Sequence, residues 1–523
     1  MRNSVAFSLH NPSVIVLLGA FLCFAASGNS HSQTSAPTIN YYISPTGNNA
    51  NSGTSPQTAW KTITYGVAQA SPGTTLHVLA GVYNELVTVD KSGSASGGYV
   101  TLLSEPQGGA ILDGTGLGIP NGQNGMVTLH GQSYVIVNGF EIRNYKTSND
   151  SLEPLGVLID GAGSNIQILN NHIHNIANTG PPHTANGCGG PNPQAHGLLV
   201  VGTAAPTPLS NITVDHNELD HLVTGCSESM TFDGNVDTFF ATNNLIHDNN
   251  NIGIDAAGFF GANHNPLYDQ ARNGYVALNT IYNITSNNNP VYPKNCWCSD
   301  GIYVDGGTHI IIERNVVHNV DLGIEMASEN FGKVGSYVWA RSNLIYSGNS
   351  AGISIGGYAS GVGGSDHLTI VNNTLLHNDN QSTGSGEFQV QYHATNNIFE
   401  NNIVDANANG LFVFSHVNQP NPVTIDYNLY FSAVGLSSSN WTWNNKNYMG
   451  FAAWQSNTGN DAHSSYADPL FVSLVTPNLH VSASSPAVNT GNTSLGATAF
   501  GTLDYAGNAR IAGSSVDKGA YEQ

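Results

Sequence analysis

The chain has 523 residues, of which 9% are charged and 40% are hydrophobic, and its formal net charge at pH 7 is -21. This negative charge argues against nucleic acid or an anionic membrane as a partner, because both are themselves anionic. The 59 Gly residues favour turn-rich β structure over a helical fold.

Residues 1–33 predict a signal peptide followed by the start of the mature chain. Arg2 precedes an apolar run over residues 14–26, which has the length of a signal-peptide core and is short for a membrane span. We expect cleavage between Ser27 and Gln33. The expected product is a secreted monomer, extracellular or periplasmic, without a membrane anchor.

Residues 34–116 predict an N-terminal cap and the first coils of a solenoid. Residues 59–70 read Ala-Trp-Lys-Thr-Ile-Thr-Tyr-Gly-Val-Ala-Gln-Ala, which predicts an amphipathic helix between two strands. A helix at this end would cover the exposed end of the hydrophobic core, as the terminal unit of a repeat fold must.

Residues 117–415 contain imperfect copies of a Gly-Ile-x-apolar-x strand. The clearest copies start at Gly301 and Gly323, 22 residues apart. Short β-branched segments at this period predict the coils of a parallel β-helix, because no coil buries its apolar face until another stacks on it. We expect about ten coils, with strands that start at Gly156, Gly197, Ser229, Gly253, Gly301, Gly323, Gly352, Glu387 and Gly410.

A second column consists of Asn residues, each followed within two residues by Ile, Leu or Val. Asn tolerates a left-handed backbone, and its side chain can hydrogen-bond the Asn one coil away. We therefore predict a structural ladder formed by Asn171, Asn217, Asn244, Asn279, Asn315, Asn343, Asn373 and Asn402.

Four cysteines remain after cleavage, and an exported chain with an even number of cysteines is expected to form disulfides. Direct pairing of Cys296 with Cys298 is sterically poor, so we expect bridges that tie the loops at 177–195 and 285–298 to the strand edge. The alternative is a four-sulfur metal site formed by Cys188, Cys226, Cys296 and Cys298.

Three segments near the start resemble a known family: Tyr-Ile-Ser-Pro-Thr-Gly-Asn-Asn at 42–49, Trp-Lys-Thr-Ile at 60–63 and Leu-Ala-Gly-Val-Tyr at 79–83. They look like the start of secreted bacterial right-handed parallel β-helix proteins of the pectate-lyase-like superfamily. The resemblance covers most of residues 40–415 and implies an all-β fold, a right-handed parallel β-helix. The superfamily includes polysaccharide lyases, glycoside hydrolases, epimerases and non-catalytic adhesins, so the reaction stays open.

Residues 416–523 predict a small β-rich C-terminal domain. Ala-Asp-Pro-Leu-Phe at 467–471 and Val-Asp-Lys-Gly-Ala-Tyr-Glu at 516–522 resemble the terminal domain that precedes varied surface anchors in β-helix proteins. No apolar anchor segment follows in the sequence, which favours release of the protein. We expect this domain to cover the C-terminal end of the solenoid.

In each repeated strand the two x positions are expected to point outward on the same face. Four of these outward residues are acidic, and their mutual repulsion is a cost that a purely structural surface need not carry. The first column contains Thr231, Asp255, Tyr303, Glu325, Ser354 and Gln389, and the second contains Asp233, Ala257, Asp305, Ala327, Gly356 and Gln391.

The acidic pattern predicts a glycoside hydrolase that cleaves a polysaccharide without a cofactor, because paired carboxylates perform this reaction. We expect Glu325 to act as the acid and Asp305 as the base or nucleophile, beside Asp255 and Asp233. The expected substrate-binding residues are Tyr303, Arg272, Lys294, His196 and Gln389.

Two alternatives remain open. In a Ca²⁺-dependent polysaccharide lyase, Arg272 or Lys294 would take the C5 proton of a uronate, and the four carboxylates would hold the ion. These carboxylates are Asp233, Asp255, Asp305 and Glu325. The other alternative is a non-catalytic carbohydrate-binding surface protein.

Overall fold

A computed structural model describes residues 38–183, 188, 192–475 and 477–523. These residues belong to one compact unit, Thr38–Gln523. The predicted signal peptide lies outside the described residues. In the part of the chain that is described, no helix is long and apolar enough to cross a membrane.

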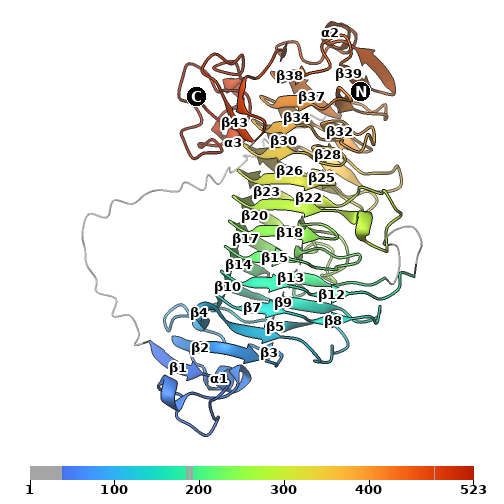
Figure 1. The fold of residues 1–523 in the computed structure, drawn as a ribbon. Coiled ribbons are helices and arrows are strands. Elements are labelled where there is room, and N and C mark those ends of the chain that lie inside the picture. Colours follow the sequence, from blue (N-terminus) through green and yellow to red (C-terminus); the bar gives the residue numbers. More distant parts are fainter. Residues whose placement is uncertain (1–37, 184–187, 189–191, 476) are drawn as a thin grey trace, which may run out of the picture. The chain divides into compact units, whose positions relative to one another are not determined.

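The unit is a right-handed parallel β-helix with few helices, as predicted (Figure 1). One sheet has 13 strands, in which all neighbours are parallel except the last pair. Its strands are β3 (Val87–Thr88), β5 (Asn124–His130), β9 (Pro154–Asp160), β13 (His196–Gly202), β16 (Met230–Gly234), β19 (Ile254–Ala256), β22 (Asp300–Asp305), β25 (Leu322–Ala327), β28 (Ile353–Ile355), β32 (Phe388–Val390), β36 (Leu411–Phe414), β39 (Asn440–Trp443) and β40 (Lys446–Met449).

The other large sheet has 26 strands, because most coils contribute more than one strand to it. Its strands are β1 (Ile39–Ile43), β2 (Thr74–Tyr83), β4 (Val100–Asp113), β6 (Val135–Asn138), β7 (Glu141–Arg143), β10 (Gly163–Leu169), β11 (His172–His174), β14 (Leu209–Asp215), β15 (Glu218–Asp220), β17 (Val236–Thr242), β18 (Leu245–Asn249), β20 (Arg272–Ala277), β21 (Thr280–Ile284), β23 (Thr308–Glu313), β24 (Val316–Val320), β26 (Val334–Arg341), β27 (Leu344–Tyr346), β29 (Gly364–Asp366), β30 (Thr369–Val371), β31 (Thr374–Leu376), β33 (Ala394–Thr395), β34 (Asn397–Glu400), β35 (Ile403–Ala406), β37 (Val423–Asp426), β38 (Leu429–Ser432) and β41 (Ser465–Tyr466).

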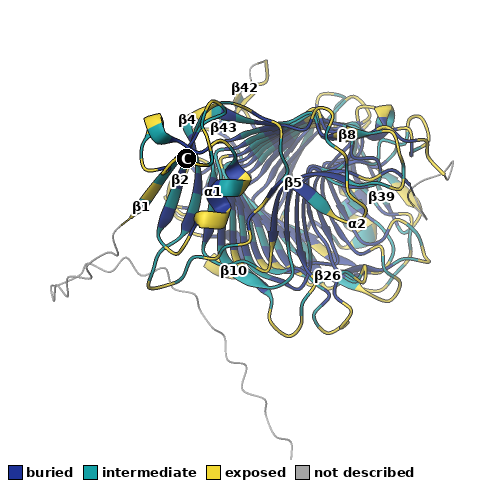
Figure 2. Ribbon diagram, turned by 90° about the horizontal axis from the view of Figure 1, so that it is seen from below, coloured by how far each residue is buried: buried dark blue, intermediate teal, exposed yellow. Residues whose placement is uncertain are grey.

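Several short elements complete the unit. Two further pairs of strands are β8 (Lys146–Thr147) with β12 (Ala177–Asn178), and β42 (Phe471–Ser473) with β43 (Asn478–Val481). The helices are α1 (Ile63–Gln69), α2 (Phe451–Thr458) and α3 (Ala497–Phe500), with 3-10 turns η1 (Pro56–Thr58), η2 (Ser286–Asn288) and η3 (Thr493–Leu495). Figure 2 shows the buried strands stacked behind one another around the core, seen from the end at which α1 lies.

The predicted register of the 13-stranded sheet is confirmed from Gly156 to Glu387, but the start expected at Gly410 is wrong by two residues, because Phe388 pairs with Val413. Asp255 pairs with Tyr303 in the next strand, and Tyr303 pairs with Glu325 in the one after. The residues between the outward positions, such as Ile302 and Val304, are buried in the core. The alternation of inward and outward side chains therefore places one whole column of the sequence on a single outer face.

The Asn ladder is also confirmed, and it continues by one further residue, Asn428. From Asn217 onward, each side-chain oxygen accepts hydrogen bonds from the backbone and side-chain N–H groups of the Asn in the preceding coil, for example from Asn279 to Asn315 at 3.0 Å. Because the turn is buried, these amides satisfy backbone groups that water cannot reach.

The N-terminal end is covered as predicted. α1 begins after Thr62, whose hydroxyl accepts the backbone N–H of Tyr65 and so caps the helix. Ile63 and Val67 of α1 are buried together with Trp60 in the main core. This helix removes the apolar edge of the first coil from water.

The C-terminal end is covered by the antiparallel pair β39 and β40 and by α2. Trp441 and Trp454 are fully buried there, with ring centroids 6.2 Å apart. The parallel sheets continue past residue 415 through β37 and β38, so the boundary expected at that position falls inside the solenoid.

The last residues lie beside the solenoid rather than over its end, contrary to expectation (Figure 1). Ala520 and Tyr521 pack against Leu344 and Leu376 of the 26-stranded sheet. These two leucines project from the outer face of β27 and β31. Their burial stabilises the position of the last residues against this face.

One disulfide agrees with the prediction and the other contradicts it. Cys188 bonds Cys226, which ties the 177–195 loop to the strand edge. Cys296 bonds Cys298 directly, because Trp297 between them has a φ of 51° and the turn brings their Cα atoms to 5.3 Å, a separation that a disulfide spans. The four-sulfur metal site is therefore wrong.

Candidate functional site

A pocket of about 540 Å³ lies over the 13-stranded sheet, where β13, β16, β19 and β22 are neighbours. Its floor consists of outward side chains of these strands, and residues in the segments before and after the strands supply the rim. The polar lining residues are Gln123, Glu153, Gln194, His196, Thr203, Ser227, Glu228, Thr231, Asp233, Asp255, Tyr292, Tyr303, Asp305 and Glu329.

The floor carries carboxylates on adjacent strands. Asp255 and Tyr303 are opposite each other in register, and Asp305 lies two residues beyond Tyr303 on β22. Asp233 on β16 corresponds to Asp305, because it lies two residues beyond Thr231, which pairs with Asp255. Because Val304 points into the core, its neighbours on β22 must point into the pocket.

One wall of the pocket is apolar. Leu199 and Val201 project from β13 and form a small cluster with Leu158 of β9, against which Ala262 packs. Phe260 on the rim is 51% exposed. The pocket thus combines an apolar wall with converging polar groups, as ligand sites of proteins usually do.

His196 is the one basic side chain among the described residues that line this acidic pocket. Its Nε2 lies 3.2 Å from Oε1 of Glu153, and its Nδ1 lies 3.1 Å from the Thr231 hydroxyl and 3.6 Å from Oε2 of Glu228. Although burial opposes protonation, the two glutamates raise the pKa of His196. The same contact lowers the pKa of Glu153, against the effect of burial.

The carboxyl groups of Asp255 and Asp305 are both difficult to ionise. Burial raises the pKa of Asp255 well above its usual range, and the charges of Glu228 and Asp305 raise it further. Burial also raises the pKa of Asp305, with the charge of Glu329 as the next cause. The charge of one carboxyl therefore opposes ionisation of the other.

Their hydrogen bonds distinguish the two groups. Oδ1 of Asp305 accepts the backbone N–H of Glu329 at 2.7 Å. Among the described residues, Oδ1 of Asp255 has no hydrogen-bond partner although it is buried. A hydrogen bond accepted from an N–H favours the ionised form, and Asp255 also accepts one from the backbone of Asp305. The two carboxyls therefore differ in the buried Oδ1 of Asp255, which lacks a partner in the described part of the chain.

The structure brings most of the predicted acidic residues together. Asp233, Asp255 and Asp305 line the pocket with Tyr303 and His196, which were predicted to bind substrate. Their roles remain predictions, but their placement on one surface follows from the confirmed register.

Glu325 and Gln389 lie further along the same column, outside the pocket lining. The Ser354 hydroxyl donates to Oε1 of Glu325 at 3.1 Å and lies 3.3 Å from Oε1 of Gln389. Burial raises the pKa of Glu325 to about 7. Glu325 is thus a neighbour of the site rather than part of its floor.

Arg272 and Lys294, which were expected to bind substrate, do not line the pocket. Arg272 belongs to β20 in the 26-stranded sheet, where its Nε lies 3.1 Å from Oδ2 of Asp237. Between Gly253 and Gly301 the chain contains the complete strands β20 and β21, so Arg272 lies in a coil and not in a loop over the pocket. Lys294 is exposed in a loop and does not line the pocket.

Three acidic residues of the pocket were not predicted from the sequence: Glu153, Glu228 and Glu329. None of them occupies an x position of the repeat. Glu228 immediately precedes the strand start at Ser229, as His196 precedes Gly197, and this shared offset was the signal that could have revealed it.

Asp233→Asn is expected to stabilise the protein above neutral pH. Burial raises the pKa of Asp233 from its ordinary value of 3.8 to about 7. The folded state therefore holds an additional proton between these values, and the free energy of unfolding falls as pH rises through this range. The variant should gain on the order of 1–3 kcal/mol at pH 8 and much less at pH 4, as measured by denaturant unfolding.

The matched control is Asp366→Asn. Hydrogen bonds from Asn396 and His367 outweigh burial and lower the pKa of Asp366, so this change should be neutral or destabilising at pH 8. Equal effects of the Asp233 change at both pH values would contradict the prediction.

Two comparisons concern the sequence. A family model described as right handed beta helix region matches residues 276–465. A protein of Bacillus subtilis (strain 168), named as uncharacterized protein YwoF, is 31% identical over 447 residues, which cover 85% of this chain and 91% of that protein.

Solved structures are similar at low identity. Pectate lyase Pel9A is 16% identical, with a TM-score of 0.43 over 93% of this chain and 97% of that chain. A GH136 lacto-N-biosidase from Eubacterium ramulus is 13% identical, with a TM-score of 0.48 over 82% of this chain and 67% of that chain. The A-module of the Azotobacter vinelandii mannuronan C-5 epimerase AlgE6 is 12% identical, with a TM-score of 0.48 over 76% and 91%.

Proposed function

We propose that this chain, which belongs to the same family as YwoF of Bacillus subtilis, is a carbohydrate-active enzyme that hydrolyses glycosidic bonds of a polysaccharide. The observation that carries the proposal is the pair Asp255 and Asp305, which share the floor of the pocket and whose pKa values are raised by burial. Glycosidic hydrolysis needs one protonated and one ionised carboxyl group beside the scissile bond.

The two carboxyls have different proposed roles. Asp255, which has a free Oδ1, would donate its proton to the glycosidic oxygen of the leaving sugar. Asp305, which accepts the Glu329 N–H, would act as the carboxylate, either on a water molecule or directly on the anomeric carbon. Glu325, the acid expected from the sequence, is kept as a second candidate because burial raises its pKa to about 7.

The charge of the pocket favours a neutral polysaccharide. Among the described lining residues there is no Lys or Arg, and the acidic members outnumber His196. A polyanionic sugar chain would be repelled by such a surface, whereas the C–H faces of an uncharged sugar can lie on the wall formed by Leu199 and Val201.

Elimination is the second candidate and receives less support. The two bases expected for it, Arg272 and Lys294, lie outside the pocket, the first in an ion pair with Asp237. A lyase of this kind would need Ca²⁺ bound by the acidic residues, so its activity should be lost when a chelator is added.

Secretion is part of the proposal. The disulfides Cys188–Cys226 and Cys296–Cys298 fit the oxidising environment outside the cytoplasm. Both cysteines of the first disulfide line the pocket, so this bond holds Cys188 beside the site.

The reaction products test the proposal. The mature protein should release reducing ends from at least one neutral polysaccharide in a panel that also includes polyuronates. The products should lack the ultraviolet absorption of an unsaturated uronate. Absorbing products that require Ca²⁺ would identify a lyase instead, and binding to a polysaccharide without any new reducing ends would identify a non-catalytic binding protein.

A further inference from the structure

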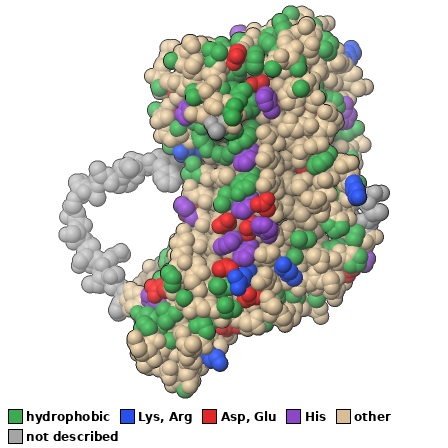
Figure 3. All heavy atoms as spheres, viewed as in Figure 1, with side chains coloured by type: hydrophobic (Ala, Val, Ile, Leu, Met, Phe, Trp, Pro, Cys, Tyr) green, Lys and Arg blue, Asp and Glu red, His purple; other side chains and the backbone are tan. Residues whose placement is uncertain are grey.

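A second group of chemically active side chains lies on the outer face of the 26-stranded sheet, on β7, β11, β15 and β18. The central residues of the first three strands pair in register and are buried, as is Ile246 of β18. The residues on either side of them point outward, and they include Glu141, His172, His174, Glu218, Asp220 and His247. Figure 3 shows His side chains among acidic ones in the middle of this face.

Three of these side chains converge from two strands. Nε2 of His172 lies 3.0 Å from Oδ1 of Asp220, and the rings of His172 and His174 stack with centroids 4.2 Å apart. One ligand atom from each of the three residues lies within 4.8 Å of the others. Two imidazole nitrogens and one carboxylate at this spacing can surround a single ion.

A second set of three shares Asp220 with the first. It consists of Glu218, Asp220 and His247, whose ligand atoms also lie within 4.8 Å of one another. Nε2 of His247 is 3.2 Å from Oε1 of Glu218, while its Nδ1 is 2.7 Å from Oδ2 of Asp248. A carboxylate on the far nitrogen of a ligating His fixes the orientation of the ring, as is usual at metal sites.

We propose that this cluster is a binding site for a divalent transition metal, of which Zn²⁺ is the representative, with His172, His174 and Asp220 as its protein ligands. Imidazole nitrogen favours Zn²⁺ and its neighbours in the transition series, whereas Ca²⁺ and Mg²⁺ prefer oxygen alone. Three protein ligands leave the fourth position of a tetrahedral ion open to water or another ligand.

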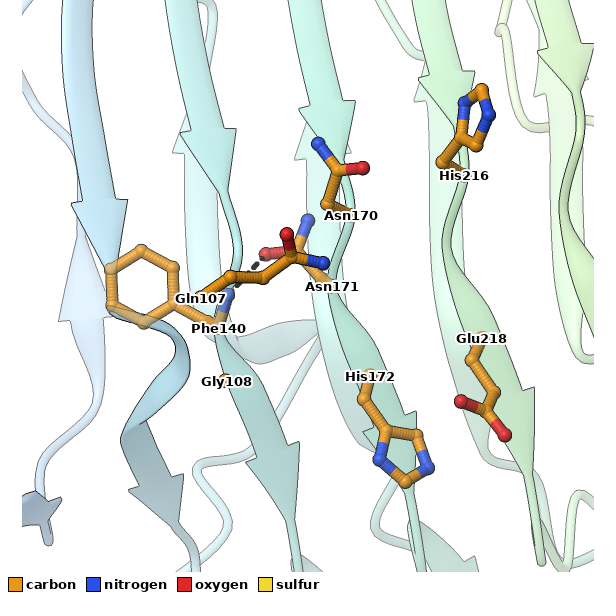
Figure 4. Close-up of a pocket in the computed structure, with 8 residues that line it drawn as sticks. All are labelled: Gln107, Gly108, Phe140, Asn170, Asn171, His172, His216 and Glu218. Carbon is orange, nitrogen blue, oxygen red and sulfur yellow. Dashed lines mark hydrogen bonds between the residues drawn. The ribbon is translucent and has the colours of Figure 1, made fainter. Parts of the chain in front are cut away.

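A cavity of about 290 Å³ adjoins the cluster and gives access to it. Its lining includes His172 and Glu218, and Figure 4 shows the two side chains near each other on neighbouring strands. Gly108 borders the same cavity, and a Cβ at that position would meet no atom within 4 Å. A small ligand can therefore approach the open position of the ion from this side.

The ordinary alternative is a set of His–carboxylate ion pairs with no ion. Such pairs occur elsewhere on the surface, for example His367 with Asp366 at 2.7 Å and His216 with Asp215 at 2.6 Å. In those pairs the residues are adjacent in sequence and only one carboxylate is involved. The proposed site differs because its ligands gather in groups of three, whereas a cross-strand pair such as His130 with Asp160 joins two residues only.

Calorimetric titration with ZnCl₂ tests the proposal on the mature, disulfide-bonded protein after treatment with a chelator and dialysis. The wild type should bind Zn²⁺ saturably, and Zn²⁺ in excess of its Kd should raise the melting temperature. The double change His172→Ala and His174→Ala should weaken binding about 100-fold or more. Asp220→Asn, which keeps the shape of the side chain, should also weaken it strongly.

The control is His367→Ala, which removes a His of the ordinary kind and should leave the affinity unchanged. Circular dichroism verifies that each variant is folded. Absence of saturable binding by the wild type, or equal affinity in the double variant, would show that the cluster consists of ion pairs only. Neither result depends on the hydrolase activity, so this site and the proposed function are tested separately.

Discussion

Asp305→Asn should lower the turnover of a responsive polysaccharide by about 10³-fold or more while the fold survives. The amide retains an oxygen that can accept the Glu329 N–H, so the local hydrogen bond at 2.7 Å can persist. What is lost is the negative charge that a base or nucleophile needs. The measurement is the rate of reducing-end release at saturating substrate.

Asp255→Asn should have an effect of the same order, because an amide cannot protonate the leaving oxygen. Glu325→Gln distinguishes the two acids: a large loss would restore Glu325 to the role expected from the sequence, whereas a small loss supports Asp255. Both positions belong to the same outward column, one on each side of Tyr303.

The matched control is Asp160→Asn. Asp160 stands on β9 of the same sheet, opposite Val201, but it does not line the pocket. Its replacement should leave turnover within about twofold of the wild type, since it removes a charge from the sheet but leaves Asp255 and Asp305 unchanged. Full activity of both Asp305→Asn and Asp255→Asn would remove these carboxyls from the mechanism.

Asn315→Ala should be among the most destabilising single changes in the solenoid. Oδ1 of Asn315 accepts two hydrogen bonds from Asn279, and its Nδ2 donates to the carbonyl of Val276 and to Asn343, all at 3.0 Å. Asn315 is fully buried, so its removal leaves several polar groups without partners. We expect a loss of about 3–5 kcal/mol in the free energy of unfolding.

Denaturant unfolding measures this effect, and Asn457→Ala provides the control. Asn457 is exposed on α2, where its side chain donates to the carbonyl of Ala453, and its replacement should change stability by less than about 0.5 kcal/mol. A loss below about 1 kcal/mol for Asn315→Ala would mean that water or a local shift satisfies the freed groups.

The sequence by itself determined the architecture and the outward columns. A repeat that alternates Ile or Val with polar residues has one stable solution, in which every coil buries its apolar side chains against the next. Register then follows from the period, because a slip of one residue would turn all core residues outward. For this reason Asp255, Tyr303 and Glu325 could be aligned before the fold was known, and so could the ladder through Asn315.

Only the tertiary structure decided which acidic residues form one site. Glu153, Glu228 and Glu329 come from the ends of strands, where the repeat no longer dictates direction, and the path of each loop brings them to the pocket. Arg272 was misplaced for the converse reason, since its strand lacks the repeated Gly-Ile start and looks like a loop. The cluster around Asp220 was not predicted either. The period shows that these side chains point outward, but only the stacking of the coils shows which of them lie next to one another.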